Sequence, residues 1–257
     1  MSSEPDFEPV PQSFKPVEDR PRPTPSVRRV VALLEVLLCS DLPTQAALGR
    51  TFAALGYQPY INGNLQIGFV AWLSLADSVL LVAMMVFFLL AHGQRPRDEF
   101  FGRRRVRPEV ALAVPLTFAA LGIAFAALAT IRRYAPGLHT VETNPLEQLI
   151  RSPRDVWLFA IVVVIAGGVR EELQRAFLLG RFERWLGGAR FGMIVTSVAF
   201  GAGHVIQGAD AMIATTALGF FWAVVYLRRR SVVAPVISHS GFNLLQTVQY
   251  FFIGSSA

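Results

Sequence analysis

Glu171 and Glu172 stand side by side in a strongly apolar part of the sequence, and Arg175 follows them. Ionisable residues in an apolar helix carry a high free-energy penalty, so they indicate either a partner or a function. At spacings of three and four residues, Arg175 shares a helical face with both carboxylates. It is therefore placed to neutralise one of them and to fix its rotamer. A structural ion pair at a helix end would explain the same residues equally well.

Two later apolar stretches each carry one histidine with a second residue four positions away. His204 follows Phe200, and Asn243 follows His239. This spacing places each pair on one face of a helix. Taken singly, such a histidine is more often explained by a hydrogen bond between helices than by catalysis.

Considered together, the three groups predict a buried polar site. The remaining faces of these helices are apolar and suit lipid, so the polar faces must point inward. We expect one cavity to be lined by Glu171, Glu172, His204, His239 and Asn243. In surroundings of low dielectric constant, a glutamate can have a raised pKa and a histidine can be neutral. Such a pair suits general-base activation of water. A second histidine with an asparagine offers hydrogen-bond donors for a developing oxyanion.

The composition predicts an all-α fold, a multi-pass transmembrane helical bundle. The chain is 53% hydrophobic and only 16% charged, whereas soluble domains carry about 25% charged residues. Spans of roughly the 20 residues that cross a bilayer are expected over 67–91, 110–131, 156–180, 191–206, 211–227 and 232–253. Residues 30–56 form either a further kinked span or two interfacial helices, so the expected number is six or seven.

The proline-rich start predicts a disordered tail over residues 1–27, followed by a membrane domain over 28–257. The tail has too few apolar residues to offset the entropy of ordering. The single cysteine, Cys39, excludes an internal disulfide, and no Cys/His zinc spacing occurs.

Arginine placement predicts the orientation of the bundle. Arginines are concentrated at 95–108, 181–190 and 228–230, which the positive-inside rule places on the cytoplasmic side. Residues 134–152 then face the opposite side, with an interfacial helix expected over 144–150. The same placement explains the net charge of +6 by anchoring of loops, and we expect no nucleic-acid partner.

The three groups resemble the motifs of the CAAX prenyl protease and bacteriocin-processing family (CPBP, or Abi) of intramembrane peptidases. The family motifs EExxxR, FxxxH and HxxxN occur in order at Glu171, Glu172 and Arg175, at Phe200 and His204, and at His239 and Asn243. The resemblance covers about residues 150–250, and the first 150 residues contribute only hydrophobicity to it.

The resemblance implies a peptidase in the cell membrane that cuts a membrane-associated peptide or lipidated protein. Its implied roles are water activation by Glu171 with His204, oxyanion stabilisation by His239 with Asn243, and organisation of the site by Glu172 and Arg175. Members are often called metalloproteases, and a Glu, His and His set can bind zinc. The sequence HExxH is absent, however, and the water-activating interpretation requires no cofactor, so we favour a metal-independent reaction.

Two other classes of function remain open. One is a non-catalytic membrane protein of the same fold, such as an immunity or partner-binding protein. The other is a small transporter or proton relay, since buried glutamates and histidines also mark ion paths. Asp77 and Cys39 belong to no motif, so we expect their substitution to matter little.

Overall fold

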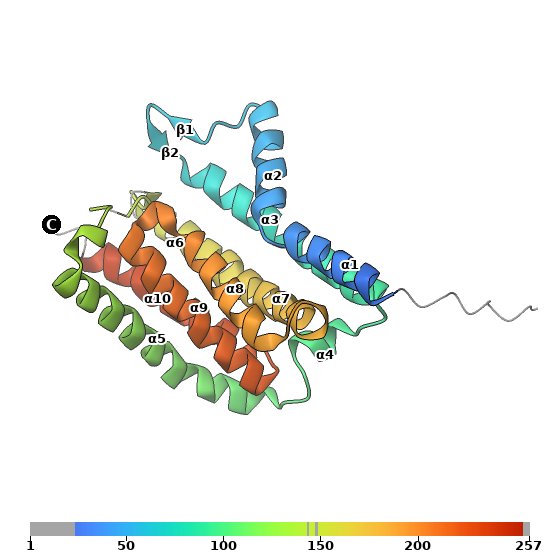
Figure 1. Ribbon diagram of the computed structural model, residues 1–257. Coiled ribbons are helices and arrows are strands. Elements are labelled where there is room, and N and C mark those ends of the chain that lie inside the picture. The colour runs from blue at the N-terminus through green and yellow to red at the C-terminus, as the bar shows by residue number, and fades with distance from the viewer. Residues whose placement is uncertain (1–23, 143, 147–148, 254–257) are drawn as a thin grey trace, which may run out of the picture.

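The computed structural model describes residues 24–142, 144–146 and 149–253, and these are almost entirely helical (Figure 1). The predicted all-α bundle is confirmed. Three helices are long and apolar enough to cross a membrane, namely α3 (Ile67–Ala91), α5 (Val106–Tyr134) and α9 (Ala209–Arg229). A fourth candidate is the pair α1 (Pro25–Leu38) and α2 (Leu42–Ala54), which are bent by 43° at a short break.

The helices that carry the polar motifs are shorter or less apolar. One helical run contains α6 (Pro153–Val162), the π-helical segment η3 (Val163–Arg170) and α7 (Glu171–Trp185). It is followed by α8 (Ala189–Ala202), the 3₁₀ turn η4 (Val205–Gln207) and, after α9, by α10 (Val233–Ile253).

The short span expected over 191–206 is wrong in its extent, because the helix ends at Ala202. The 14 residues of α8 extend about 21 Å at 1.5 Å per residue. This is short of the ~30 Å hydrocarbon core. In the part of the chain that the structure describes, three or four helices therefore meet the length and composition of a span, fewer than the six or seven expected.

The helices pack in two groups that meet at the motif-bearing run. In the first, α9 and α10 both pack against α5, and Trp222, Leu218 and Phe242 form a buried apolar cluster with Ala120. In the second, α1 and α3 pack against α7 around Phe177 and other buried residues. Because α10 also packs against η3, the segment before the glutamates lies between the two groups.

The beginning of the described chain differs from the sequence-based expectation at one point. Helix α1 begins at Pro25, and the side chain of Thr24 accepts a hydrogen bond from the backbone N–H of Val27. Residues 25–27 of the predicted tail are therefore helical, and residues 1–23 lie outside the described residues. Residues 30–56 form two helices with a break at 39–41, a geometry compatible with either alternative for this segment.

Short elements complete the described chain. They are the hairpin strands β1 (Tyr60–Ile61) and β2 (Asn64–Leu65), helix α4 (Pro96–Phe100) and the 3₁₀ turn η1 (Pro136–Leu138). The interfacial helix expected over 144–150 includes residues 147–148, which lie outside the described residues.

The arginine-rich connections gather at one end of the bundle (Figure 1). Both Nη atoms of Arg230 bond to the carboxylate of Glu183, and Arg184 forms an ion pair with Glu99. The hydrogen bonds from Arg230 hold the pKa of the Glu183 carboxyl below its usual range. The connections predicted to share one side of the membrane therefore do lie together.

Candidate active site

The motif glutamates begin α7 directly after the π-helical segment η3. In a π-helix the backbone bonds connect residues five apart, and such segments are frequent at functional sites. Two glycines in η3 allow α10 to approach closely. A Cβ atom on Gly167 would lie 2.7 Å from Nδ2 of Asn243, and one on Gly168 would overlap the side chain of Ser240. The glycines thus bring the HxxxN helix against the EExxxR helix.

Glu172 is fixed between two motif partners. Its carboxylate pairs with Arg175, three residues on, and its Oε1 lies 2.8 Å from Nδ1 of His239. The side chain of Glu172 is 0% exposed. The guanidinium of Arg175 also lies 4.7 Å from the ring centroid of Phe200. The contact expected between Arg175 and one glutamate is therefore present, and Glu172 is the glutamate concerned.

Glu171 has different surroundings although it is the neighbouring residue. Its Oε1 lies 3.3 Å from Nη2 of Arg170, and its Oε2 lies 3.8 Å from Nε2 of His239. The side chain of Glu171 is 16% exposed. Of the two motif glutamates, Glu171 is thus the accessible one, and it faces a ring nitrogen of His239.

The hydrogen bonds of the two histidines indicate which nitrogen of each ring carries the proton. The carbonyl oxygen of Phe200 accepts from Nδ1 of His204 at 2.8 Å, and the carboxylate of Glu172 accepts from Nδ1 of His239. In the neutral rings, Nε2 is therefore unprotonated in both. An unprotonated Nε2 accepts a proton. His239 donates to an oxyanion only as the imidazolium, which the adjacent Glu172 stabilises.

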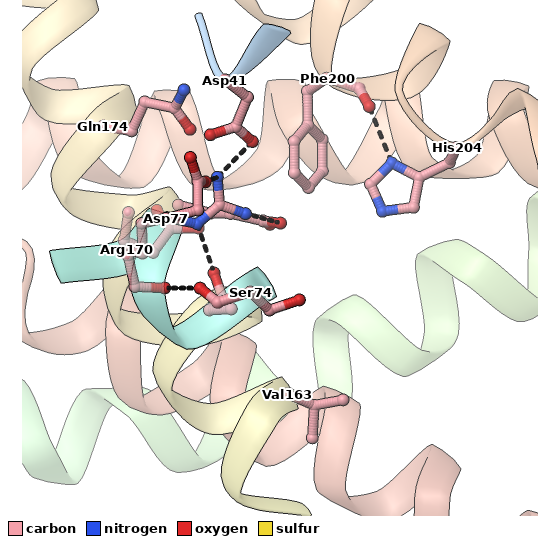
Figure 2. A network of polar contacts seen from close by, with 12 residues as sticks. Asp41, Ser74, Asp77, Val163, Arg170, Gln174, Phe200 and His204 are labelled. Carbon is pink, nitrogen blue, oxygen red and sulfur yellow. Dashed lines mark hydrogen bonds and ion pairs between the residues drawn. The ribbon is translucent and has the colours of Figure 1, made fainter. Parts of the chain in front are cut away.

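His204 reaches the site in a way that the spacing did not predict. Helix α8 ends at Ala202, so Phe200 and His204 do not share a helical face as expected. Instead, the bond from Nδ1 to the Phe200 carbonyl folds the histidine back (Figure 2). The ring of Phe200 lies 5.0 Å from that of His204 and 6.0 Å from that of His239. Phe200 therefore contacts both histidines. Among the described residues, no hydrogen bond or ion pair joins His204 to Glu171.

Asn243 lies on the same face of α10 as His239. Its Nδ2 donates to the carbonyl oxygen of Val163 at 3.4 Å. A side-chain amide has two N–H groups, so the second can donate to another acceptor. The structure thus brings Glu171, Glu172, His239 and Asn243 to the contact between α10 and the run η3–α7, with His204 reached through Phe200.

Trp222 is a site residue that the motifs do not include. Its ring stacks on that of His239, with centroids 3.8 Å apart and planes 18° apart, and its Nε1 donates to Oγ of Ser238 at 3.0 Å. It is 0% exposed. An aromatic residue in an apolar helix carries no special spacing, so the sequence offered no signal for this contact.

Asp77 lies beside the residue that precedes the motif glutamates. Although Asp77 belongs to no motif, its carboxylate is buried and lies 3.7 Å from Nη1 of Arg170, the residue before the glutamates. Arg170 also pairs with Asp41. The first 150 residues therefore contribute more to this region than hydrophobicity.

The arrangement offers no preformed metal-ligand set among the described residues. Glu172, His204 and His239 are the residues that would supply one. Glu172 and His239 are hydrogen-bonded to each other through Nδ1, which leaves Nε2 of His239 as the ring nitrogen that could bind an ion.

The fold and this site together define an integral membrane helical protein with a buried acid–histidine centre. Residues 153–245, just over a third of the chain, match a family model described as type II CAAX prenyl endopeptidase Rce1-like. This segment is similar to that family and contains all three motifs, so the match supports the resemblance drawn from them. No curated protein and no solved structure matches the chain. At the level of the family, the match supports an intramembrane protease.

Proposed function

We propose that the protein is an intramembrane endopeptidase in which Glu171 and a histidine activate water against a peptide bond. The observation that carries this proposal is the contrast between two adjacent glutamates. Glu172 is locked by Arg175 and His239, whereas Glu171 remains accessible and faces Nε2 of His239 at 3.8 Å. A water molecule beside this pair would contact both a carboxylate and a ring nitrogen that accepts a proton.

The reaction follows from these positions. Glu171, with the Nε2 of a histidine, takes a proton from water, and the resulting hydroxide adds to the carbonyl carbon of the substrate. The free N–H of Asn243 and the imidazolium of His239 stabilise the oxyanion. The proton then passes to the leaving amine as the C–N bond breaks. His204 has its Nε2 available as a second acceptor, and Glu172 with Arg175 holds His239 in place.

The proposed substrate is a peptide presented at the membrane. The family description refers to a prenyl endopeptidase, so we propose a C-terminal peptide with an S-prenylated cysteine as the substrate class to test first. A site within a bundle of apolar helices suits a substrate whose lipid anchor stays in the bilayer.

The test measures turnover of a fluorogenic, S-farnesylated CAAX peptide by the full chain in proteoliposomes. Glu171→Gln keeps the size of the side chain and removes the base, so we expect kcat to fall about 10²–10⁴-fold. Glu183→Gln, on the same helix but in the exposed pair with Arg230, is the matched control and should keep full turnover. A non-prenylated peptide tests the need for the lipid.

Three outcomes would contradict the proposal. Full turnover by Glu171→Gln would exclude this residue as the base. Loss of activity on chelation, with recovery on addition of zinc, would refute the metal-independent version. A wild-type protein that binds the peptide without cutting it would favour a non-catalytic, partner-binding function.

A further inference from the structure

The guanidinium of Arg170 contacts carboxylates from three parts of the chain (Figure 2). It pairs with Asp41 at the break between α1 and α2, lies 3.7 Å from Asp77 on α3, and lies 3.3 Å from Glu171. The side chains of Arg170 and Asp77 are only 7% and 1% exposed. Water therefore does little to screen these contacts.

Two side chains on one face of the EExxxR helix hold the break between α1 and α2. Arg170 and Gln174 are four residues apart, so they lie on the same face. Nε2 of Gln174 donates to the carbonyl oxygen of Cys39 at 2.7 Å, next to the Asp41 contact. Glu172 and Arg175 use a different face, toward His239. The helix therefore contacts the N-terminal helices with one face and α10 with another.

Asp41 has an unusual backbone for its residue type. Its φ is +76°, in the left-handed region that few residues other than glycine adopt. Such a conformation persists where the surroundings fix it. Here the ion pair with Arg170 and the Gln174 bond to Cys39, two residues earlier, hold the break in this shape.

Sharing of Arg170 among three carboxylates determines where Glu171 can point. An arginine with one buried carboxylate partner tends to form a two-bond pair with it. Arg170 instead uses Nη1 for Asp41, leaves Nη2 near Glu171, and bonds through Nε to the carbonyl oxygen of Ala166 at 3.2 Å. Glu171 is thereby left with one Arg170 contact, and its Oε2 faces His239.

We propose that Asp41 and Asp77 are positioning residues for Glu171 and that they act through Arg170. On this proposal, which rests on the proposed peptidase function, the α1–α2 break and α3 complete the active site. Without either acid, Arg170 turns further toward Glu171 and draws its carboxylate away from His239. The defect should then appear in the chemical step and leave binding of the peptide intact.

The experiment compares Asp41→Asn, Asp77→Asn and Arg170→Lys in the proteoliposome assay with the farnesylated peptide. Asparagine tolerates the left-handed conformation, so Asp41→Asn changes the charge and spares the backbone. We expect kcat to fall roughly 10- to 100-fold, as for a base misplaced by about 1 Å, with KM changed less than about twofold. Lysine lacks the planar fork that contacts several acids and should have the same effect. Asp41→Glu restores the charge but not the ease of the positive φ, so it should recover only part of kcat.

The matched control is Glu109→Gln. It removes a buried carboxylate, 1% exposed, from an ion pair between Arg229 and the first turn of α5. A merely structural role for Asp41 and Asp77 would lower the folded fraction, as in the control, and leave kcat per folded molecule unchanged. Hydrogen–deuterium exchange of residues 163–172 supplies a second readout that needs no activity. It should rise in the Asp41 and Asp77 variants and not in Glu109→Gln.

The two proposals fail in different ways. If wild type cuts the peptide and Glu171→Gln does not, full kcat in Asp41→Asn and Asp77→Asn overturns the positioning role and leaves the peptidase proposal standing. If wild type does not cut the peptide, the peptidase proposal fails. The hydrogen–deuterium exchange data then test the positioning role alone. Unchanged exchange of residues 163–172 in both variants would show that Asp41 and Asp77 do not fix this segment.

Discussion

Substitution of Gly168 by alanine should separate the two halves of the proposed active site. A Cβ atom there would overlap Oγ of Ser240 and lie 3.0 Å from its Cβ and 3.2 Å from its Cα. Rotation of the serine side chain relieves only the first of these contacts. The backbone of α10 must therefore move, and His239 and Asn243 move with it.

The size of the effect follows from these distances. Ordinary carbon–carbon contacts lie at about 3.5–4.0 Å, so the helices must separate by several tenths of an ångström to about 1 Å. A displacement of 1 Å in a catalytic arrangement lowers the rate by about 10²-fold. We therefore expect kcat of Gly168→Ala to fall 10- to 100-fold in the farnesyl-peptide assay, with correct membrane insertion.

Gly122→Ala is the matched control, because a Cβ at Gly122 on α5 meets nothing within 4 Å. Replacing a helical glycine by alanine in open space stabilises a helix by about 0.5–1 kcal/mol, so this variant should keep full activity and melt slightly higher. Adding Ser240→Gly to Gly168→Ala removes both the hydroxyl and the Cβ that collide, and it should restore part of kcat. Full activity in Gly168→Ala, or no recovery in the double variant, would refute this account of the close contact.

Three further substitutions test individual contacts. Glu172→Gln leaves Arg175 as a buried, unpaired charge and should lower the free energy of unfolding by about 3–5 kcal/mol, measured as a fall in Tm in detergent that Glu183→Gln does not show. Asn243→Ala removes an oxyanion donor and should lower kcat about 10²–10³-fold, while loss of its bond to the Val163 carbonyl lowers Tm by the equivalent of about 1 kcal/mol; a loss of kcat below threefold would contradict its role. Trp222→Phe keeps an aromatic ring on His239 but loses the bond to Ser238, so Tm should fall by the equivalent of about 1 kcal/mol while most turnover persists, whereas Trp222→Leu should lose turnover as well.

Local patterns in the sequence predicted those parts of the structure that depend on neighbouring residues. The apolar run over 67–91 coincides with α3, because a long stretch without charges leaves a helix little alternative in lipid. Arg175 pairs with Glu172 as the spacing of three predicted. The contact between α10 and the glutamate helix also followed from the need to bury polar faces together.

Other features depend on relations that periodicity does not express. The hydrogen-bond register of η3 differs from that of an α-helix by one residue. Apolar residues occur in both kinds of helix, so the sequence does not distinguish them. The ion pair of Arg170 with Asp41 joins residues 129 positions apart, with no motif to connect them. His204 lies after the end of α8 because the chain turns at Gly203, so a spacing of four residues gave the correct pair but the wrong local structure.

The divergence of Glu171 and Glu172 explains why a pair of adjacent carboxylates is useful at this site. Consecutive helical residues point about 100° apart, so the two side chains meet different neighbours. Glu172 turns toward His239 and Arg175 and is sealed from solvent, while Glu171 turns toward Arg170 and stays partly accessible. Glu172 can therefore remain a fixed, charged partner that orients His239 throughout the proposed reaction. Glu171 is free to exchange a proton with water, since Arg170 divides its charge among three acids. In the proposed reaction, one helix thereby supplies both the reacting group and the group that orients its partner.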